Sequence, residues 1–223
     1  AASDVYKRQP AAGSGRRFGE AKQFKLLAGR PLLFHSMKPF LESSIIQEVI
    51  VVVPDYQIDT VHNDLLSISA GKPLKVIAGG TRRQDSVKNG VTATVSSTTM
   101  VCIHDAVRPF VSETLINNSI AACKTADGAV VALRSADTVK LSEHGIVKET
   151  LNREKIWLVQ TPQTFRKDKL IQALDHADEK SLAATDESYL MEAMGFSVAL
   201  VQGDINNFKI TTMDDWKRAE YLI

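Results

Sequence analysis

Short apolar runs of strand length alternate along the chain with segments in which apolar residues recur at helical spacing. After the first clear run, Ile58, Val61 and Leu65 lie three or four positions apart, as on one face of a helix. This alternation is typical of βαβ units and predicts an α/β fold with a mostly parallel sheet flanked by helices. The predicted strands are residues 48–53, 74–78, 100–103, 129–133 and 197–201, and the predicted helices include residues 112–124, 167–177 and 185–194.

A different pattern begins near residue 137, where polar and apolar positions alternate over two short segments. Residues 138–141 and 146–151 are separated by Ser142-Glu143-His144-Gly145, which predicts a β-hairpin in an arm at about residues 136–153. A two-stranded hairpin is only marginally stable alone, so its apolar residues need a covering surface. A second copy of the chain is the cover we favour, which predicts a homodimer. The alternative is a hairpin that folds back onto its own domain.

The composition indicates one soluble domain over residues 1–223. Hydrophobic residues make up 44% of the chain, which suffices for a sizeable core. The formal net charge of +1 gives no overall field for nucleic acid or an anionic membrane, and the apolar runs are far shorter than the ~20 residues of a membrane helix. Cys102 and Cys123 form no CxxC motif, and no histidines fall at metal-ligand spacing. We therefore expect a cytoplasmic protein with neither nucleic-acid nor membrane partners.

Residues 10–19, Pro-Ala-Ala-Gly-Ser-Gly-Arg-Arg-Phe-Gly, are small residues followed by cations, and Lys22 and Lys25 come soon after. Small residues let backbone N–H groups approach phosphate oxygens, and the cations neutralise a triphosphate. The segment is not a Walker loop, because Gly15 precedes two arginines, and it does not complete the dinucleotide motif, because Phe18 replaces the third glycine. The alternative is a surface loop with solvated charges.

Two further segments follow predicted strands, where open α/β sheets bind their ligands. The first is His104-Asp105-Ala106-Val107-Arg108-Pro109, in which the carboxylate can hold Mg²⁺ against a triphosphate and the arginine can bind an anionic second substrate. The second is Gly-Gly-Thr-Arg-Arg-Gln-Asp-Ser-Val, residues 79–87, which can hold a base and a ribose by hydrogen bonds. For each there is a local alternative: Asp105 can cap a turn with Arg108 as its partner, and residues 79–87 can form an ordinary capped turn.

Together these segments belong to a series that resembles the 2-C-methyl-D-erythritol 4-phosphate cytidylyltransferase family of the non-mevalonate isoprenoid pathway. The resemblance runs from Pro10 to the C-terminus and is carried, in the family's order, by PAAGSGRRFG, AKQF, GGTRRQDSV, HDAVRP, DTVK, LNREKIWLVQTPQTF, ATDES and NNFKITTMDDW. It implies a Rossmann-like α/β domain with a protruding β-hairpin arm for dimerisation. It also implies transfer of CMP from CTP to 2-C-methyl-D-erythritol 4-phosphate, with release of pyrophosphate and with Mg²⁺ as cofactor.

The resemblance also implies roles for individual residues. Arg17 and Lys22 look like the pair that stabilises charge on the α-phosphate and on the leaving pyrophosphate. Arg153 and Lys209 look like the residues that hold the attacking phosphate in line. The implied nucleotide contacts are Ala11, Ala12, Gly13, Gly15, Gly80, Thr81, Ser86, Asp105 and Ala106, with Asp105 also the metal ligand. The implied polyol-phosphate contacts are Arg108, Thr138, Thr161 and Thr185, and Thr138 with Arg153 would reach the site of the other subunit.

The chain departs from the family pattern in the nucleotide loop and at its start. Thr81 stands where many relatives have an acidic residue, which weakens the assignment of base recognition. The family has an apolar first strand before PAAG, whereas this chain has Asp4-Val5-Tyr6-Lys7-Arg8-Gln9. A central strand is almost continuously hydrophobic, and an unpaired buried cation costs several kcal/mol. We therefore interpret residues 1–9 as an anomalous replacement of the natural strand.

Two other activities fit the same sequence. Ribitol-5-phosphate cytidylyltransferases share most of these motifs, so ribitol 5-phosphate is the first alternative substrate. The second alternative is a non-catalytic nucleotide-binding protein, which the altered first strand makes conceivable. Such a protein would bind CTP without releasing pyrophosphate.

Overall fold

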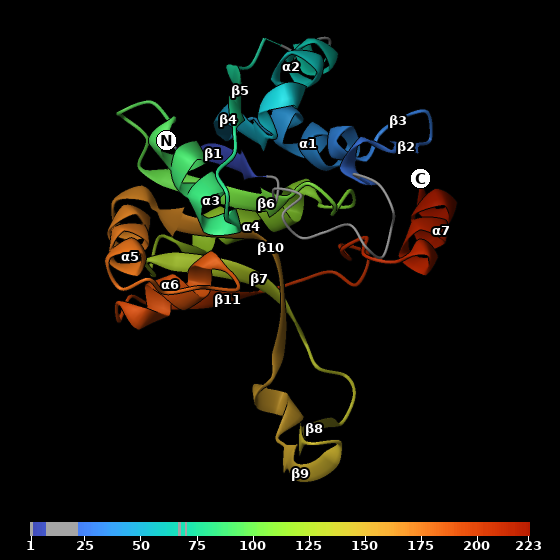
Figure 1. Ribbon diagram of the computed structural model, residues 1–223, viewed down its shortest axis with the longest axis vertical. Coiled ribbons are helices and arrows are strands. Elements are labelled where there is room, and N and C mark those ends of the chain that lie inside the picture. The colour runs from blue at the N-terminus through green and yellow to red at the C-terminus, as the bar shows by residue number, and fades with distance from the viewer. Residues whose placement is uncertain (1, 8–21, 67, 70) are drawn as a thin grey trace.

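The computed structural model describes the backbone of residues 2–7 and, with their side chains, residues 22–66, 68–69 and 71–223. In this part of the chain a seven-stranded sheet lies between two layers of helices (Figure 1). From edge to edge its strands are β11 (Val198–Gln202), β7 (Gly128–Arg134), β10 (Trp157–Arg166), β6 (Met100–Asp105), β1 (Ala2–Lys7), β4 (Ile46–Val53) and β5 (Leu74–Ala78). The predicted α/β class is confirmed.

Most neighbouring strands in this sheet run parallel. β1 pairs with β4 and β6, β4 with β5, and β7 with β11 in parallel, whereas β10 runs antiparallel to both β6 and β7. The chain first winds outward from β1 through β4 to β5, and then crosses back to place β6 on the other side of β1. The winding therefore reverses between β1 and β6.

Two strands of the sheet have sequences that the apolar pattern did not mark. The backbone of β1 pairs with β6 from Ala2, opposite Met100, to Lys7, opposite Asp105. The other is β10, whose buried middle is polar and includes Gln160, Thr161, Gln163 and Thr164. Both strands are paired on each side, so neighbouring strands supply the hydrogen bonds that hold them. That residues 1–9 replace a natural apolar strand stays a prediction.

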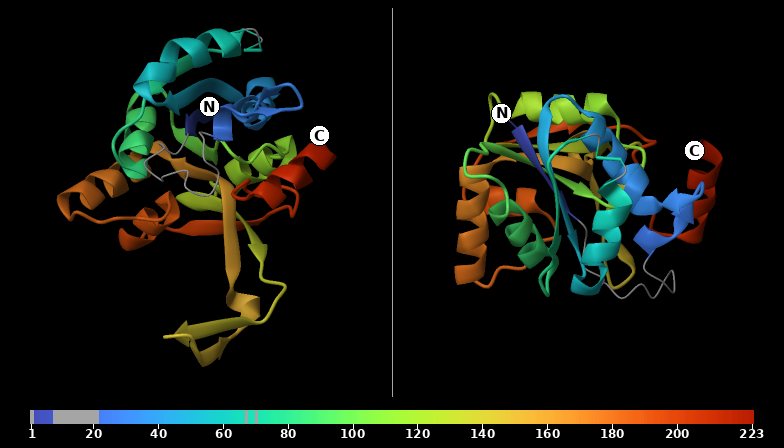
Figure 2. Two further views of the ribbon diagram at one scale, coloured as in Figure 1. Left: turned by 45° about the vertical axis from the view of Figure 1, so that its right-hand side comes forward. Right: turned by 90° about the horizontal axis from the view of Figure 1, so that it is seen from above.

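Helices cover both faces of the sheet (Figure 2). On one face lie α1 (Leu32–Glu42), α2 (Ile58–Leu66) and α4 (Glu113–Ala122), and on the other lie α3 (Arg83–Thr92), α5 (Lys167–Glu179) and α6 (Glu187–Ala193). The last helix, α7 (Met213–Leu222), packs beside the ribbon of β2 (Leu26–Leu27) and β3 (Arg30–Pro31). Short 3₁₀ turns are η1 (Lys22–Phe24), η2 (Asp55–Gln57) and η3 (Arg153–Lys155). Of the helices described, none has the length and apolar character to cross a membrane.

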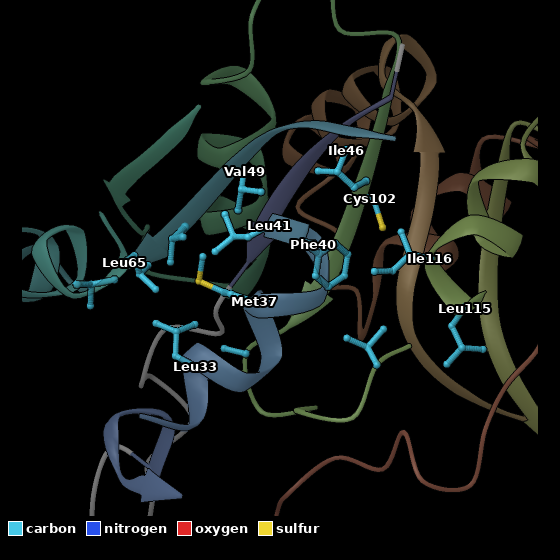
Figure 3. Close-up of a cluster of buried hydrophobic side chains, with 14 of the residues drawn as sticks. Leu33, Met37, Phe40, Leu41, Ile46, Val49, Leu65, Cys102, Leu115 and Ile116 are labelled. Atoms are coloured by element: carbon cyan, nitrogen blue, oxygen red, sulfur yellow. The ribbon is translucent and has the colours of Figure 1, made fainter. Parts of the chain in front are cut away.

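The largest buried cluster lies between the sheet and α1, α2 and α4. Figure 3 shows Leu33, Met37 and Phe40 of α1 on the side of the helix that faces the sheet. They meet Val49 of β4 and Cys102 of β6, and all five side chains are almost completely buried. The apolar spacing of three and four residues along α1 thus places one face of the helix in the core.

The predicted hairpin consists of β8 (Val139–Glu143) and β9 (Ile146–Leu151), within the predicted range of the arm. His144 and Gly145 join the strands with positive φ angles of 50° and 79°, which is the geometry of a tight hairpin turn. The hairpin extends away from its own domain and does not fold back onto it (Figures 1 and 2). Its apolar residues are therefore exposed on the surface: the exposed fraction is 73% for Ile146 and 57% for Val147.

Gly128 should be intolerant of any side chain. A Cβ at this position would lie 2.4 Å from Cδ1 of the fully buried Phe165, and overpacking of a core typically costs about 1–3 kcal/mol. We expect Gly128→Ala to lower the free energy of unfolding by about that amount in urea titrations. In a Phe165→Leu background, which removes the ring, the same substitution should cost less. An equal cost in both backgrounds would refute this steric explanation.

Candidate functional site

Two of the predicted loops lie at the carboxyl ends of neighbouring parallel strands, because β5, β4, β1 and β6 run in the same direction. This side of the sheet, where the parallel strands end, is the edge at which the site lies. Asp105 is the last residue of β6, and residues 79–82 connect β5 to α3. The winding reverses between β1 and β6 at this edge, which is where open α/β sheets bind ligands. The predicted phosphate-loop residues lie outside the described residues: Ala11, Ala12, Gly13, Gly15 and Arg17.

The turn between β5 and α3 requires glycine at position 80. The Gly80 N–H donates to Ser86 Oγ over 3.0 Å, and a Cβ on Gly80 would lie only 2.3 Å from the Cβ of Asp85. The Ser86 hydroxyl is fully buried and lies 3.2 Å from the Arg82 carbonyl, to which it donates. Two predicted nucleotide contacts, Gly80 and Ser86, are therefore bonded to each other, and Thr81 between them is exposed.

The carboxylate of Asp105, whose side chain is 15% exposed, lies largely buried among cations. Its Oδ2 lies 2.9 Å from Lys209 Nζ and 3.7 Å from Arg108 Nε. Arg83 adds a third attractive charge. Burial alone would raise the pKa of this carboxyl group, but the three cations together hold the pKa well below its usual range. The carboxylate is therefore charged throughout the physiological pH range.

A chain of hydrogen bonds fixes the backbone beneath this carboxylate. The Asp105 N–H donates to Thr161 Oγ1 over 3.0 Å, and the Thr161 hydroxyl donates to His104 Nδ1 over 2.9 Å. The other ring nitrogen, Nε2, donates to the Arg108 carbonyl over 3.0 Å. Because a carbonyl only accepts, the proton of the neutral ring is on Nε2. His104 is fully buried against Phe40, and this burial lowers its pKa to about 4.

Residues 206–210 approach the same loop from the C-terminal side. Arg108 Nη1 donates to the Asn207 carbonyl over 2.7 Å, and the Asn207 side-chain amide donates to the Thr161 carbonyl over 2.8 Å. Asn207 is fully buried. These bonds fix the segment that carries Lys209, whose ammonium group remains partly exposed, with a side-chain exposure of 33%. Lys209 therefore contacts both the Asp105 carboxylate and the solvent at the edge of the sheet.

The geometry agrees with comparisons to known proteins. Residues 8–223 match the family described as 2-C-methyl-D-erythritol 4-phosphate cytidylyltransferase, IspD. The enzyme of that name from Geobacter metallireducens is 39% identical to this chain over 225 residues, covering 98% of this chain and 97% of the relative. This chain belongs to the IspD family.

Solved structures of IspD proteins have the same fold as this chain. The 2-C-methyl-D-erythritol 4-phosphate cytidylyltransferase from Francisella tularensis matches with a TM-score of 0.83 and 30% identity over 100% of both chains. The 4-diphosphocytidyl-2C-methyl-D-erythritol synthase from Anaerococcus prevotii matches with a TM-score of 0.87 and 28% identity, over 99% of this chain and 97% of that one. The family resemblance expected from the motifs, and with it the class of nucleotidyltransferases, is confirmed.

The structure gathers part of the predicted site of this IspD chain. Asp105, Arg108, Thr161 and Lys209 form one group at the edge of the sheet. Ala106 follows Asp105, but it is buried, and its carbonyl accepts from Ser36 Oγ of α1 over 2.9 Å. Gly80 and Ser86 lie in the loop at the same edge. Lys22 begins η1, and Thr185 is an exposed residue two positions before α6.

Thr138 directly precedes β8, and Arg153 begins η3, which follows β9, so both belong to the protruding arm (Figure 1). Arg153 Nη1 donates to the Ala136 carbonyl over 3.0 Å and so joins the two ends of the hairpin. The hairpin carries both residues away from Asp105 of their own chain. Their contacts with a polyol phosphate stay predictions.

Sequence reasoning missed three residues that organise the site. The sequence gives His104 no role of its own, although it lies in the HDAVRP motif. The motifs GGTRRQDSV and NNFKITTMDDW contain Arg83 and Asn207, but neither motif indicates a role for them. Their positions inside motif segments were the available signal. Their partners could not be read, because those partners lie in distant parts of the chain.

Neutral His104 should make the protein acid-sensitive. Its pKa is about 4 in the folded protein and near 6.5 in an unfolded chain, so the unfolded state binds a proton first as the pH falls. Stability should therefore be complete above about pH 6.5 and decrease toward pH 4, by roughly 3 kcal/mol from this group. Urea titrations across this range should give a flatter pH dependence for His104→Gln than for the natural chain. Parallel curves for the two proteins would contradict a buried neutral histidine.

Proposed function

We propose that this protein transfers the CMP group of CTP to the phosphate of 2-C-methyl-D-erythritol 4-phosphate and releases pyrophosphate. Membership of the IspD family supports this activity. The structural observation that carries it is the group of Lys209 and Arg108 around the charged Asp105, at the edge where the winding of the sheet reverses. Two cations beside one carboxylate can receive both a metal-bound triphosphate and a second phosphate.

The reaction is an in-line displacement between two anions. An oxygen of the polyol phosphate attacks the α-phosphorus of CTP, a new P–O bond forms, and the bond from the α-phosphorus to the bridging oxygen of the leaving pyrophosphate breaks. The chain has to position the anions and offset their mutual repulsion. No covalent intermediate with the protein is required.

Lys209 and Arg108 suit this task in different ways. The partly exposed ammonium group of Lys209 can move from Asp105 to an incoming phosphate oxygen. The guanidinium group of Arg108 is held in place through Nη1, and its buried Nε–H lies 3.7 Å from the Asp105 carboxylate, too far for a hydrogen bond, with no other acceptor among the described residues. A buried donor without an acceptor is costly. A phosphate oxygen would satisfy it.

Asp105 fits the Mg²⁺ ion that the family resemblance implies. Among the described residues, no three or more His, Cys, Asp or Glu side chains gather as a metal cluster. Mg²⁺ bound to nucleotides commonly takes only one or two protein carboxylates and draws its other ligands from phosphates and water. We propose that Asp105 is this carboxylate. The ion would neutralise phosphate charge.

The loop after β5 supplies the nucleotide side of the proposed site. The Ser86 hydroxyl accepts from the Gly80 N–H and fixes the backbone of this loop, which lies at the same edge of the sheet as Asp105. We propose that the loop binds cytosine and ribose. The phosphate loop with Arg17 and the following Lys22 would bind the triphosphate.

Pyrophosphate release should require CTP and 2-C-methyl-D-erythritol 4-phosphate together. A coupled assay that crosses CTP, ATP, GTP and UTP with this substrate and with ribitol 5-phosphate gives the specificity directly. Lys209→Ala should lower kcat/KM by roughly 100-fold, as the loss of one charge-stabilising donor does in other enzymes. The control is Lys217→Ala, which removes a lysine that is 71% exposed on α7.

Each contrary result of this assay has a defined meaning. Pyrophosphate release from CTP with ribitol 5-phosphate, but not with 2-C-methyl-D-erythritol 4-phosphate, would identify ribitol 5-phosphate as the acceptor substrate. Binding of CTP without release under any combination would establish the non-catalytic alternative. Full activity of Lys209→Ala would leave the electrostatic mechanism without support.

We also propose that the hairpin is a dimerisation arm and that the domain is Rossmann-like and cytoplasmic. The parallel strands β5, β4, β1 and β6 have the order 3-2-1-4 by chain position, which is the start of the Rossmann order. Ile146 and Val147 expose apolar surface on a hairpin that is too small to be stable alone. A second copy of the chain would cover them and receive Arg153 at its site.

Charged residues on the arm should therefore separate the subunits. Ile146→Asp combined with Val147→Asp should give a monomer in analytical ultracentrifugation and abolish pyrophosphate release. The control is Tyr56→Asp on η2, because Tyr56 is 74% exposed, about as much as Ile146 at 73%. A dimeric, active arm variant would refute the proposed arm.

Subunit mixing tests whether the arm completes the other subunit's site. Arg153→Ala and Lys209→Ala should each be nearly inactive alone. After the two variants exchange subunits at equal concentration, half of the dimers are mixed and each mixed dimer has one intact site. Activity should then return to about a quarter of the natural level. No recovery would show that Arg153 acts in its own subunit or not at all.

A further inference from the structure

Arg83 and Glu187 form a buried ion pair between two helix starts. Arg83 is the first residue of α3 and Glu187 the first residue of α6. Arg83 Nη1 donates to Glu187 Oε1 and Arg83 Nη2 to Glu187 Oε2, each over 2.7 Å. The side chains are 19% and 1% exposed. Such a two-point contact fixes both distance and orientation.

The pair lies close to the charges of the proposed site. Burial alone would lower the pKa of Arg83, but the neighbouring carboxylates, Glu187 foremost and then Asp105 and Asp186, raise it above its ordinary value. Arg83 thus serves two groups at once: it neutralises Glu187 and contributes to the cations that keep Asp105 charged. A change in the position of this guanidinium group would therefore change the electrostatic environment of both carboxylates.

Each end of the pair is attached to a different side of the site. Arg83 follows directly on the loop that carries Gly80, whose partner Ser86 lies in the first turn of α3. Glu187 follows the exposed Thr185, and the residue between them, Asp186, caps α6 by accepting from the Tyr189 N–H over 3.1 Å. The pair therefore spans from the nucleotide loop to the predicted polyol-phosphate contact.

A second bond ties the same helix start to the sheet. Gln163 Nε2 of β10 donates to Asp186 Oδ2 over 3.0 Å, and Gln163 lies two residues after Thr161, which bonds the Asp105 N–H. The start of α6 is thus held from two directions, by Arg83 on the helix side and by Gln163 on the strand side.

We propose that the Arg83–Glu187 pair is a positioning element that holds the nucleotide loop and the polyol-phosphate side of the site in one fixed relation. This role rests on the proposed function. Neither residue is among the proposed substrate contacts, so the pair is assigned a positioning role, which it exerts through the loops to which its two members belong. Loss of the pair should weaken the productive binding of both substrates together.

Stability alone gives no good reason for this pair. A cation in the first turn of a helix opposes the helix dipole. Replacement of a buried ion pair by apolar residues of similar size is often neutral or stabilising. The same helix also has an exposed network, in which Arg82 and Lys88 bond Asp178 of α5. That network already joins α3 to its neighbour.

The decisive variant replaces both charges at once. Arg83→Met with Glu187→Met should keep the melting temperature close to that of the natural chain, because no charge is left buried without a partner. The KM values for CTP and for 2-C-methyl-D-erythritol 4-phosphate should each rise about tenfold. A purely structural pair would change the melting temperature or the active fraction, and hence kcat, and would leave both KM values as they were.

Two further variants complete the design. Lys88→Met with Asp175→Leu removes an ion pair of the exposed network, in which Lys88 Nζ lies 2.6 Å from Asp175 Oδ1; as a matched control it should leave both KM values within about twofold of natural. Arg83→Lys keeps the charge but loses the two-point contact, and it decides the matter if the double variant does not fold. At an unchanged melting temperature, raised KM values in Arg83→Lys support the proposal.

The outcomes separate this proposal from the proposed function. If the natural chain releases no pyrophosphate from CTP, the proposed function fails, and the pair is then not a positioning element for it. If the natural chain is active and the folded double variant, or failing that Arg83→Lys, keeps both KM values, the positioning role is overturned. Raised KM values in the exposed-network control as well would also overturn it, because any contact of α3 would then have the same effect.

Discussion

The buried charge of Asp105 is the constraint on which the arrangement of this site depends. An isolated carboxylate in a protein interior becomes neutral or destabilises the fold. Here three cations compensate it, and they come from separate segments: Arg83 from the start of α3, Arg108 from the loop after β6, and Lys209 from the segment before α7. One carboxylate at the end of a central strand is thus compensated by one cation of its own loop and by two from distant parts of the chain.

The compensation extends outward, because buried cations need partners of their own. Arg108 bonds the carbonyl of Asn207, and Arg83 bonds Glu187 in α6. Beneath these charges lies a neutral layer, in which the His104 ring bonds the Thr161 hydroxyl. The neutral layer fixes backbone positions, and the charged layer determines the electrostatic potential at the edge of the sheet.

Sequence reasoning succeeded where one local signal was enough. The apolar runs placed β4 and β6, and the predicted connection at residues 142–145 marked the hairpin, although its first two residues belong to β8 and only His144 and Gly145 form the turn. It missed β10, because Gln160, Thr161 and Gln163 are buried polar residues whose partners lie elsewhere in the chain.

For the candidate site, too, the sequence predicted positions along the chain but not contacts between distant residues. The motifs indicated which loops gather at the edge of the sheet, since strand direction alone decides that. They did not indicate that Thr161 is buried between Asp105 and His104, or that Arg83 pairs with Glu187. Adjacent arginines in one motif have opposite surroundings, because Arg82 points to the exposed Asp178 and Arg83 to a buried carboxylate. Exposed pairs of the first kind contribute little. A buried two-point pair often adds no more stability than apolar residues of similar size, so its distinctive property is the fixed geometry that it imposes on two helix starts beside the charge of Asp105.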